Sequence, residues 1–302
     1  MNGQAWGPCV STVRHHAAMA QSDMPTMRSR RLGNELRRLR LANDLKVAEV
    51  AEILECGQPK ISQIENGKRG IRQIDLTLLL DRYGVEDDQY RVGLKQLARD
   101  IHKVDWWSYQ GPLLRDTLRD YLTLEADAEL MRSYEPALVP GLLQTESYMR
   151  QLFTASVPKE RVEALVETRL KRKELLENHP DFRLRAIIDE SALIRIAGPT
   201  ALVQEQLLHL HEASQLPTVT LQVLPLRAKF AYSQLQPFNL FRFRGEPSID
   251  VAWLEYLTGG TLLEQRSDVQ AYAEVWDELT AAALSPSESR RLIKGLTKES
   301  AS

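Results

Sequence analysis

Two short amphipathic segments joined by a tight turn lie between residues 45 and 70, and they constrain the fold more than any other feature. Their apolar residues recur at i, i+3, i+4 and i+7 in the first segment and at i and i+3 in the second: Val47, Val50, Ala51, Leu54, then Ile61 and Ile64. Glu55, Cys56 and Gly57 supply the turn. Because Ala51 is small, the two helices can cross closely. The spacing therefore predicts a helix-turn-helix.

The second of these helices presents a polar outer face. With Ile61 and Ile64 turned inward, the rotation of about 100° per residue turns the polar side chains of this helix away from the core. Gln pairs well with adenine, and Lys donates to guanine or to phosphate. Pro59 is tolerated because it falls in the first turn, where its missing N–H would have no partner. The residues expected to contact base edges of double-stranded DNA are Gln58, Pro59, Lys60, Ser62 and Gln63.

Charge is distributed unevenly along a chain that is nearly neutral overall. Residues 28–72 contain eleven Lys or Arg against six Asp or Glu, whereas residues 73–302 contain 27 against 34. A basic segment is typical of a phosphate-binding surface, and an acidic remainder is expected to face away from DNA. For each basic side chain, an ordinary solubilising role is the alternative. The residues expected to contact phosphate are Lys46, Asn66, Lys68, Arg69 and Arg72.

This region resembles the XRE-type, lambda-repressor-like DNA-binding domain. The motifs that carry the resemblance are Val50-Ala51-x-x-Leu54, Ile61-Ser62-Gln63-Ile64-Glu65 and Asn66-Gly67-Lys68. The resemblance implies an all-α domain of five helices over roughly residues 31–100, with an ion pair between Arg40 and Glu65; a solvated Glu65 is the alternative. Two residues depart from the pattern. Glu55 stands where a turn Gly is common, and Gly57 replaces a Ser cap at a cost of a few tenths of a kcal/mol, roughly.

Length and composition favour two domains in a reducing compartment. A chain of 302 residues with 43% hydrophobic content can bury more than one core. Its two cysteines, Cys9 and Cys56, are far apart, so a disulfide scaffold is not expected. No apolar run approaches the roughly 18 residues needed to span a bilayer. We therefore expect a cytoplasmic, nucleoid-associated protein without a membrane segment.

The domain boundaries follow from breaks in these patterns. Residues 1–27 lack helical or strand periodicity and are expected to be a dispensable disordered tail; an over-extended start before Met24 or Met27 is an equal explanation. A DNA-binding domain at 28–103 is expected to end with a helix at about 74–83, closed by Gly84, and another at about 87–102. Residues 104–112 are expected to form an aromatic junction, whose paired tryptophans join the two domains; stacking on nucleic acid or on a ligand is the alternative.

The second domain, 113–302, mixes helices with strands. Strands are predicted at 182–188, 219–224, 238–243, 249–256 and 261–263, and helices at 159–178, 200–214, 267–283 and 286–297. Ser285, Pro286 and Glu288 form a capping box with proline at the first helical position. Strands that cluster between helices without strict alternation predict an α+β fold with a largely antiparallel sheet. Residues 121–134 fit neither pattern clearly.

This second half is similar to the C-terminal domain of unknown function in actinobacterial XRE regulators of the WhiJ type. The resemblance rests on 134–145, in which the run 139–145 is distinctive, with support from Leu124-Glu125, Asp189-Glu190, 221–225 and 282–289. The resemblance implies an antitoxin-like or sensing role toward a small protein encoded nearby, and no catalytic residues. A helix is expected after an N-cap at Thr145. The possible partner surface is Leu142, Leu143, Gln144 and Tyr148, with a buried turn as the alternative.

Motifs of catalysis are scarce in this sequence. It has no phosphate-binding GxxxxGK[ST], GxSxG, HExxH or CxxC pattern. His209 and His211 point to different sides of a helix, and Asp189-Glu190 is either an acid–base pair or a solvated helix start. We therefore expect no enzyme, cofactor or metal site. The predicted function is a sequence-specific transcriptional regulator that binds DNA as a homodimer and senses a small protein; a small-molecule receptor or enzyme in the C-terminal domain is the alternative.

Overall fold

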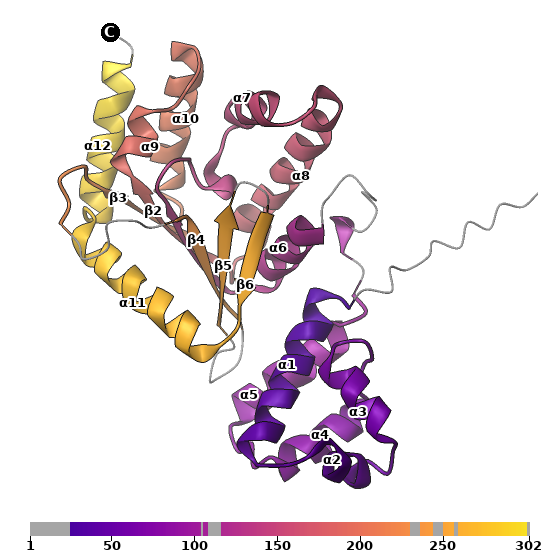
Figure 1. Cartoon of the computed structure of the whole chain (residues 1–302). Helices are drawn as coiled ribbons and strands as arrows, with labels where there is room; N and C mark the ends of the chain where they lie inside the picture. The colour runs from indigo at the N-terminus through magenta and orange to yellow at the C-terminus, as the bar shows by residue number, and fades with distance from the viewer. Residues whose placement is uncertain are drawn as a thin grey trace, which may run out of the picture.

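The computed structural model describes residues 25–103, 105–107, 116–229, 236–243, 250–256 and 259–300. A bundle of helices at the N-terminal end is followed by a larger domain built on one sheet (Figure 1). Within the described ranges, no helix has the length and apolar character required to cross a membrane. Of the expected aromatic junction, residues 105–107 are described, and Trp107 is buried against Leu122.

The N-terminal bundle forms around the apolar residues that the sequence pattern selected. Its helices are α1 (Met27–Ala42), α2 (Val47–Ile53), α3 (Gln58–Glu65), α4 (Gln73–Arg82) and α5 (Asp88–Asp100). Val50, Ala51, Ile61 and Ile64 are all at most 4% exposed and belong to a single core. Asp87 caps α5 by accepting a hydrogen bond from the Tyr90 N–H. The helix-turn-helix is therefore α2 and α3.

Glycines allow α1 and the end of α3 to approach each other more closely than other residues would. A Cβ atom at Gly33 of α1 would lie 2.6 Å from the carbonyl oxygens of both Ile64 and Glu65. Gly67 has φ +70°, and a Cβ there would lie 2.8 Å from the Arg30 backbone nitrogen. Ala51 was expected to be the small residue where α2 crosses α3, and the close approach at Gly33 was not predicted from the sequence.

The turn between α2 and α3 explains one of the departures from the family pattern. Glu55 has φ +45°, in the left-handed region that favours glycine, so glutamate adopts there the conformation that the common turn Gly would supply. Gly57 is the N-cap of α3 and provides no side-chain cap. Cys56 in this turn is a free, half-buried thiol, and Cys9 lies outside the described residues.

The C-terminal domain is built on one mixed sheet with strand order β3-β2-β1-β4-β5-β6. Its strands are β1 (Leu130–Glu135), β2 (Arg183–Asp189), β3 (Val219–Leu224), β4 (Phe238–Arg242), β5 (Val251–Tyr256) and β6 (Gly259–Leu263). Three of the five strand pairings are antiparallel, and β1–β2 and β2–β3 are parallel. Helical crossovers connect the parallel strands, because the chain must return to the end of the sheet at which the first strand began before a second strand can run in the same direction.

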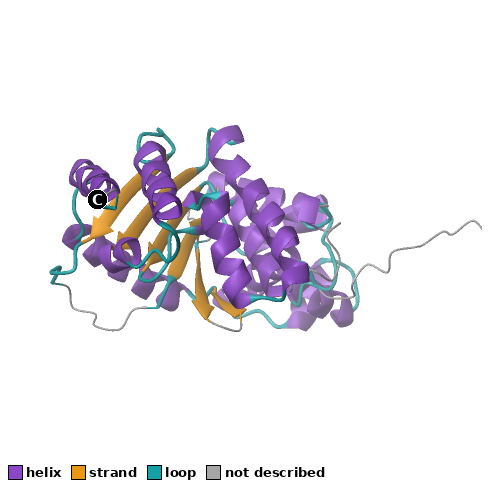
Figure 2. Ribbon diagram, turned by 90° about the horizontal axis from the view of Figure 1, so that it is seen from above, coloured by secondary structure: helices purple, strands orange, loops and turns teal. Residues whose placement is uncertain are grey.

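Helices cover both faces of this sheet (Figure 2). On one face, buried residues of the sheet pack with apolar side chains of α6, α7, α8, α9, α10 and α12, and α11 covers the other face. The helices are α6 (Asp116–Asp127), α7 (Glu146–Ser156), α8 (Lys159–Asn178), α9 (Glu190–Ile194), α10 (Thr200–Ala213), α11 (Arg266–Ala282) and α12 (Pro286–Glu299), with a 3₁₀ turn at Gly141–Leu143. The capping box at Ser285 and the Thr145 cap of α7 are both present.

The structure resolves the segment that the sequence left open and shifts one boundary. Residues 121–134 divide into the second half of α6 and most of β1. Because β1 contains charged and polar residues, its sequence does not indicate that it is a central, largely buried strand. The boundary expected at residue 27 is wrong, because α1 begins at Met27 and the Thr26 hydroxyl accepts from the Ser29 N–H. Met27 is 3% exposed and packs within the core of the C-terminal domain. Residues 1–24 lie outside the described part of the chain.

Candidate nucleic-acid interface

The outer face of α3 is polar and open to solvent. Gln58, Pro59 and Gln63 are exposed, and Lys60 and Ser62 are half-buried. Pro59 lies in the first turn of the helix, where no backbone donor is lost. Asn66 is the exposed C-cap. The residues predicted for base contacts thus lie on the first two turns of one helix, and Gln58 and Gln63 have the freest side chains for a groove.

A buried ion pair fixes this helix to α1. Arg40 Nε lies 2.6 Å from Glu65 Oε1, and Arg40 Nη2 lies 2.9 Å from Oε2, so the pair is bidentate. Arg40 is 7% exposed and Glu65 is 6% exposed. The hydrogen bond to Glu65 raises the pKa of Arg40 above its usual value although burial opposes this. Arg40 Nη1 also donates to the Leu45 carbonyl oxygen at 2.8 Å, so one guanidinium positions both helices of the motif.

Asp75 of α4 holds two of the predicted DNA-contacting cations. Arg72 Nη2 lies 2.8 Å from Asp75 Oδ1, and Lys60 Nζ lies 3.3 Å from Oδ2. The hydrogen bond from Arg72 lowers the pKa of Asp75, burial opposes it, and Lys60 adds to the lowering. Asp75 was not predicted to belong to this site, because nothing in the sequence around it indicates that its carboxylate pairs with Lys60 and Arg72. Asp75 of α4 therefore orients the side chains of Lys60 and Arg72.

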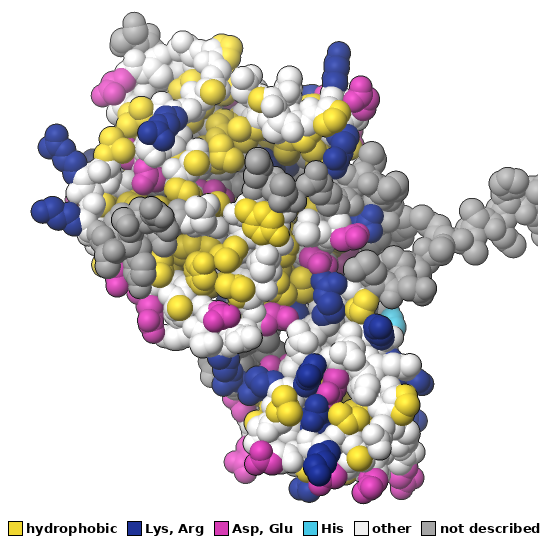
Figure 3. Space-filling model, viewed as in Figure 1, with side chains coloured by type: hydrophobic (Ala, Val, Ile, Leu, Met, Phe, Trp, Pro, Cys, Tyr) yellow, Lys and Arg dark blue, Asp and Glu magenta, His cyan; other side chains and the backbone are white. Residues whose placement is uncertain are grey.

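The remaining predicted phosphate contacts are exposed. Lys46 lies at the N-cap of α2, and Lys68 and Arg69 lie in the loop that follows α3. None of these three forms an ion pair with another residue in the described ranges. In Figure 3, Lys and Arg side chains lie on the helical bundle, with Asp and Glu side chains among them. Lys46 therefore precedes the two helices of the motif and Lys68 and Arg69 follow them, with side chains that are free to reach phosphate.

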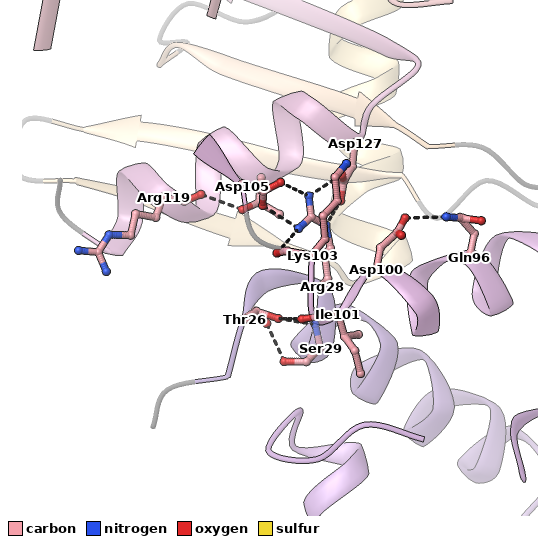
Figure 4. A network of polar contacts seen from close by, with 11 residues as sticks. Thr26, Arg28, Ser29, Gln96, Asp100, Ile101, Lys103, Asp105, Arg119 and Asp127 are labelled. Carbon is pink, nitrogen blue, oxygen red and sulfur yellow. Dashed lines mark hydrogen bonds and ion pairs between the residues drawn. The ribbon is translucent and has the colours of Figure 1, made fainter. Parts of the chain in front are cut away.

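Part of the basic segment faces the C-terminal domain, which corrects the interpretation of charge. Arg28 is 2% exposed and lies between two carboxylates (Figure 4). Its Nη1 donates to Asp105 Oδ2 and its Nε to Asp127 Oδ2, both at 2.7 Å. Burial lowers the pKa of Arg28, but the hydrogen bonds to Asp127 and Asp105 outweigh it, so the pKa is raised. Arg28 is an interdomain residue and is removed from any phosphate surface.

Three neighbours on α1 extend this interface. Arg30 pairs with Asp120, and Asn34 Nδ2 donates to Glu264 Oε2 at 2.6 Å. The Arg31 guanidinium carbon lies 3.5 Å from the centre of the Phe243 ring. Burial lowers the pKa of Arg31 to about 10. The acidic domain therefore contacts the basic segment directly at one end of α1, whereas the expectation was that it faces away.

The predicted partner surface in the C-terminal domain is wrong. Leu142, Leu143, Gln144 and Tyr148 are 1%, 0%, 2% and 4% exposed. Gln206 of α10 accepts from the Thr145 N–H and donates to the Leu143 carbonyl oxygen, each at 2.8 Å. Gln144 Nε2 donates to the Val139 carbonyl oxygen at 2.7 Å. This segment is the buried turn that closes the domain, because its backbone groups find partners inside and its leucines fill the core.

The residues considered for catalysis have structural roles. Asp189 Oδ1 accepts from the Ser191 N–H at 2.8 Å and caps α9, and Glu190 Oε2 accepts from the Leu226 N–H at 2.8 Å. His209 Nε2 lies 3.1 Å from Lys173 Nζ. In the part of the chain that the structure describes, no group of three or more His, Cys, Asp or Glu is placed to hold a metal ion.

The fold and the exposed polar face of α3 define the class, a helix-turn-helix protein with an appended mixed-sheet domain. Residues 31–91 match the helix-turn-helix domain family. Residues 118–295, more than half of the chain, match the family described as a domain of unknown function (DUF5753), and the chain belongs to that family. No curated protein and no solved structure matches it.

Proposed function

We propose that this protein is a sequence-specific transcriptional regulator that reads DNA with α3. One observation carries the proposal: Gln58 and Gln63 project from a helix that the Arg40–Glu65 pair fixes in place. Amide side chains read base edges, and a helix held rigidly presents them in one register. The match to a helix-turn-helix domain over residues 31–91 and the resemblance to XRE-type domains support the same function.

We propose that the protein binds two half-sites as a homodimer. Helix-turn-helix proteins commonly place two recognition helices about one turn of DNA apart, which makes an inverted repeat the expected operator. Lys46, Lys68 and Arg69 are exposed on either side of the motif and supply the phosphate contacts that set its register. A regulator of this kind acts in the cytoplasm, on the nucleoid.

The C-terminal domain is proposed to sense a second molecule and to act through α1. Asp120 and Asp127 of this domain, with Asp105 of the junction, hold Arg28 and Arg30, so a shift in this domain moves the helix to which α3 is fixed. The resemblance to WhiJ-type regulators supports an antitoxin-like role, with a small protein as the partner. We propose binding rather than catalysis, because Asp189 and Glu190 are already engaged with backbone N–H groups.

A small-molecule receptor is the second candidate function. The observation that favours it is a pocket of about 250 Å³ between the two domains, lined by Trp106 and Trp107. A ligand in this position would contact residues that also hold the interdomain network. The two candidates differ in the effector alone, and both require that α3 binds DNA.

Selection from a random duplex library with the full chain tests the proposed function. The expected result is an enriched inverted repeat, bound about 10³-fold or more tightly than scrambled DNA. Glu52→Gln, at an exposed residue of α2, is a control for nonspecific changes in surface charge, whereas Gln63→Ala alters the preference at one base pair. Equal affinity for all duplexes would refute sequence-specific regulation. Capture of partners from native extract by the full chain, followed by mass spectrometry, tests the small-protein effector.

A further inference from the structure

A pocket lies where the helical domain meets α6 and α8, next to the Arg28 network of Figure 4. Its volume is about 250 Å³, and its walls include Trp106, Trp107, Leu122, Lys171, Leu175 and His179. Sites for drug-sized ligands have volumes of about 300–1,000 Å³. This pocket therefore suits a smaller ligand, with one or two fused rings.

The two tryptophans form an aromatic corner. Their ring centres lie 5.3 Å apart, and the ring planes are nearly perpendicular at 84°. A planar aromatic ligand in this corner can stack on one indole and meet the edge of the other. Leu122 and Leu175 complete an apolar wall from α6 and α8. The shape and the lining both favour an aromatic ring.

The free charges around the pocket are mainly positive. Two of its carboxylates are already neutralised, Asp105 by Arg28 and Glu125 by Arg172. Lys103 and Lys171 form no ion pair among the residues that the structure describes, and Lys171 Nζ lies 4.8 Å from the centre of the Trp106 ring. Glu174 is the one further acidic residue of the lining. Two free ammonium groups beside an aromatic corner select an aromatic anion.

We propose that this junction pocket binds a small planar aromatic carboxylate, with its ring against Trp106 and Trp107 and its carboxylate at Lys171 and Lys103. We further propose that the bound ligand changes the affinity of the helical domain for DNA. This second statement rests on the proposed function, whereas the binding site itself does not.

A continuous set of contacts links the pocket to the DNA-contacting loop. Asp105 precedes Trp106 and accepts hydrogen bonds from Arg28 at 2.7 and 3.0 Å. Arg28 belongs to α1, and the neighbouring Arg30 backbone packs on Gly67 so closely that a Cβ would lie 2.8 Å away. Gly67 begins the loop that carries Lys68. A ligand that displaces Asp105 therefore shifts the end of α1 on which this loop packs.

Calorimetric titration of the full chain with 2-naphthoate, in the absence of DNA, tests the site. Binding with a Kd of about 1 mM or tighter is expected. Lys171→Gln should weaken the binding of 2-naphthoate about threefold to fivefold. The uncharged analogue 2-naphthalenemethanol, which has the same rings, should bind to the unmodified chain about as weakly as 2-naphthoate binds to this variant. Trp106→Leu should weaken both compounds. Lys294→Gln, an exposed lysine on α12, is the matched control and should change nothing.

Titration of the selected operator with and without saturating 2-naphthoate tests the coupling. A change of about fivefold or more in DNA affinity is expected, and Arg28→Lys, at a residue on the route but outside the pocket lining, should reduce it while the compound still binds. Absence of binding at roughly 10 mM, or binding that neither Lys171→Gln nor Trp106→Leu alters, would overturn the proposal. Bound compound with unchanged DNA affinity would overturn the coupling. If no operator exists, the proposed function fails, but the calorimetric result still decides the site.

Discussion

Replacing Arg40 with methionine should lower the free energy of unfolding of the helix-turn-helix domain by far more than most single substitutions do. The substitution keeps a long apolar stem but leaves the buried Glu65 carboxylate without its bidentate partner. Removing one member of a buried ion pair costs about 3–5 kcal/mol, because the other charge stays buried and unpaired. The Leu45 carbonyl oxygen also loses its donor. We expect a loss of about 4 kcal/mol from the free energy of unfolding of this domain.

Hydrogen exchange measured by mass spectrometry on the full chain isolates this domain from the other one. Backbone amides of α1 and α3 report the free energy of opening directly, so the two-domain chain need not unfold in one step. Arg37→Met is the matched control, because Arg37 is exposed on the same helix, and its effect should lie within about 0.5 kcal/mol of zero. The double variant Arg40→Met with Glu65→Leu should recover most of the stability, since it buries no charge.

A loss in free energy of unfolding below about 1 kcal/mol for Arg40→Met, or one no larger than that for Arg37→Met, would refute this prediction. Such a result would mean that water reaches Glu65 in the absence of its partner, and that the pair orients α3 without stabilising it. A double variant that is less stable than the single one would instead show that the two side chains pack favourably beyond their charges.

Three further predictions concern DNA and pH. Gln63→Ala should cost about 1–3 kcal/mol at the selected operator and relax its preference at one position, as measured by titration against single-base variants. Lys68→Gln should weaken binding to cognate and scrambled duplexes equally and lower the salt slope by about one, whereas Lys294→Gln should alter neither. Burial, with the nearby Glu255 charge, raises the pKa of Glu135 from 4.5 to about 8 in the folded chain. Its protonated form therefore favours folding, so the contribution of Glu135 to stability is greatest below pH 4.5 and is lost as the pH rises toward 8. Glu135→Gln should remove this pH dependence. Denaturation of both chains at several values between about pH 5 and 8.5 measures it, and an equal loss of stability in the two chains would contradict the prediction.

Elements with local signals were largely predictable. The expected strand at 219–224 and helix at 159–178 have those bounds in the structure, because apolar spacing and flanking breakers act within a few residues. The caps at Thr145 and Ser285 are likewise set by bonds to backbone three residues away. The strand at 130–135 was missed because its burial depends on two neighbouring strands rather than on its own composition.

The candidate site divides in the same way. The outer face of α3 could be predicted because rotation along a helix fixes which side chains share a side. The ion pairs of its cations could not be predicted, since Asp75 lies close to Lys60 and Arg72 only after α4 has packed. The distinctive run at Leu142 and Leu143 carries no signal that separates a binding surface from a buried turn, because both require apolar residues.

The sequence by itself determined the helix-turn-helix, the exposed polar face of its second helix and most of the secondary structure, since these depend on periodicity and on caps between near neighbours. Only the tertiary structure decided which charges are internal. Arg28 and Asp127 are 99 positions apart, yet they form a hydrogen-bonded pair that joins the two domains. A count of charges along the chain assigns Arg28 to the DNA surface, because it contains no distances. Coulomb energy and desolvation depend on separation and burial in space, which only the folded chain defines.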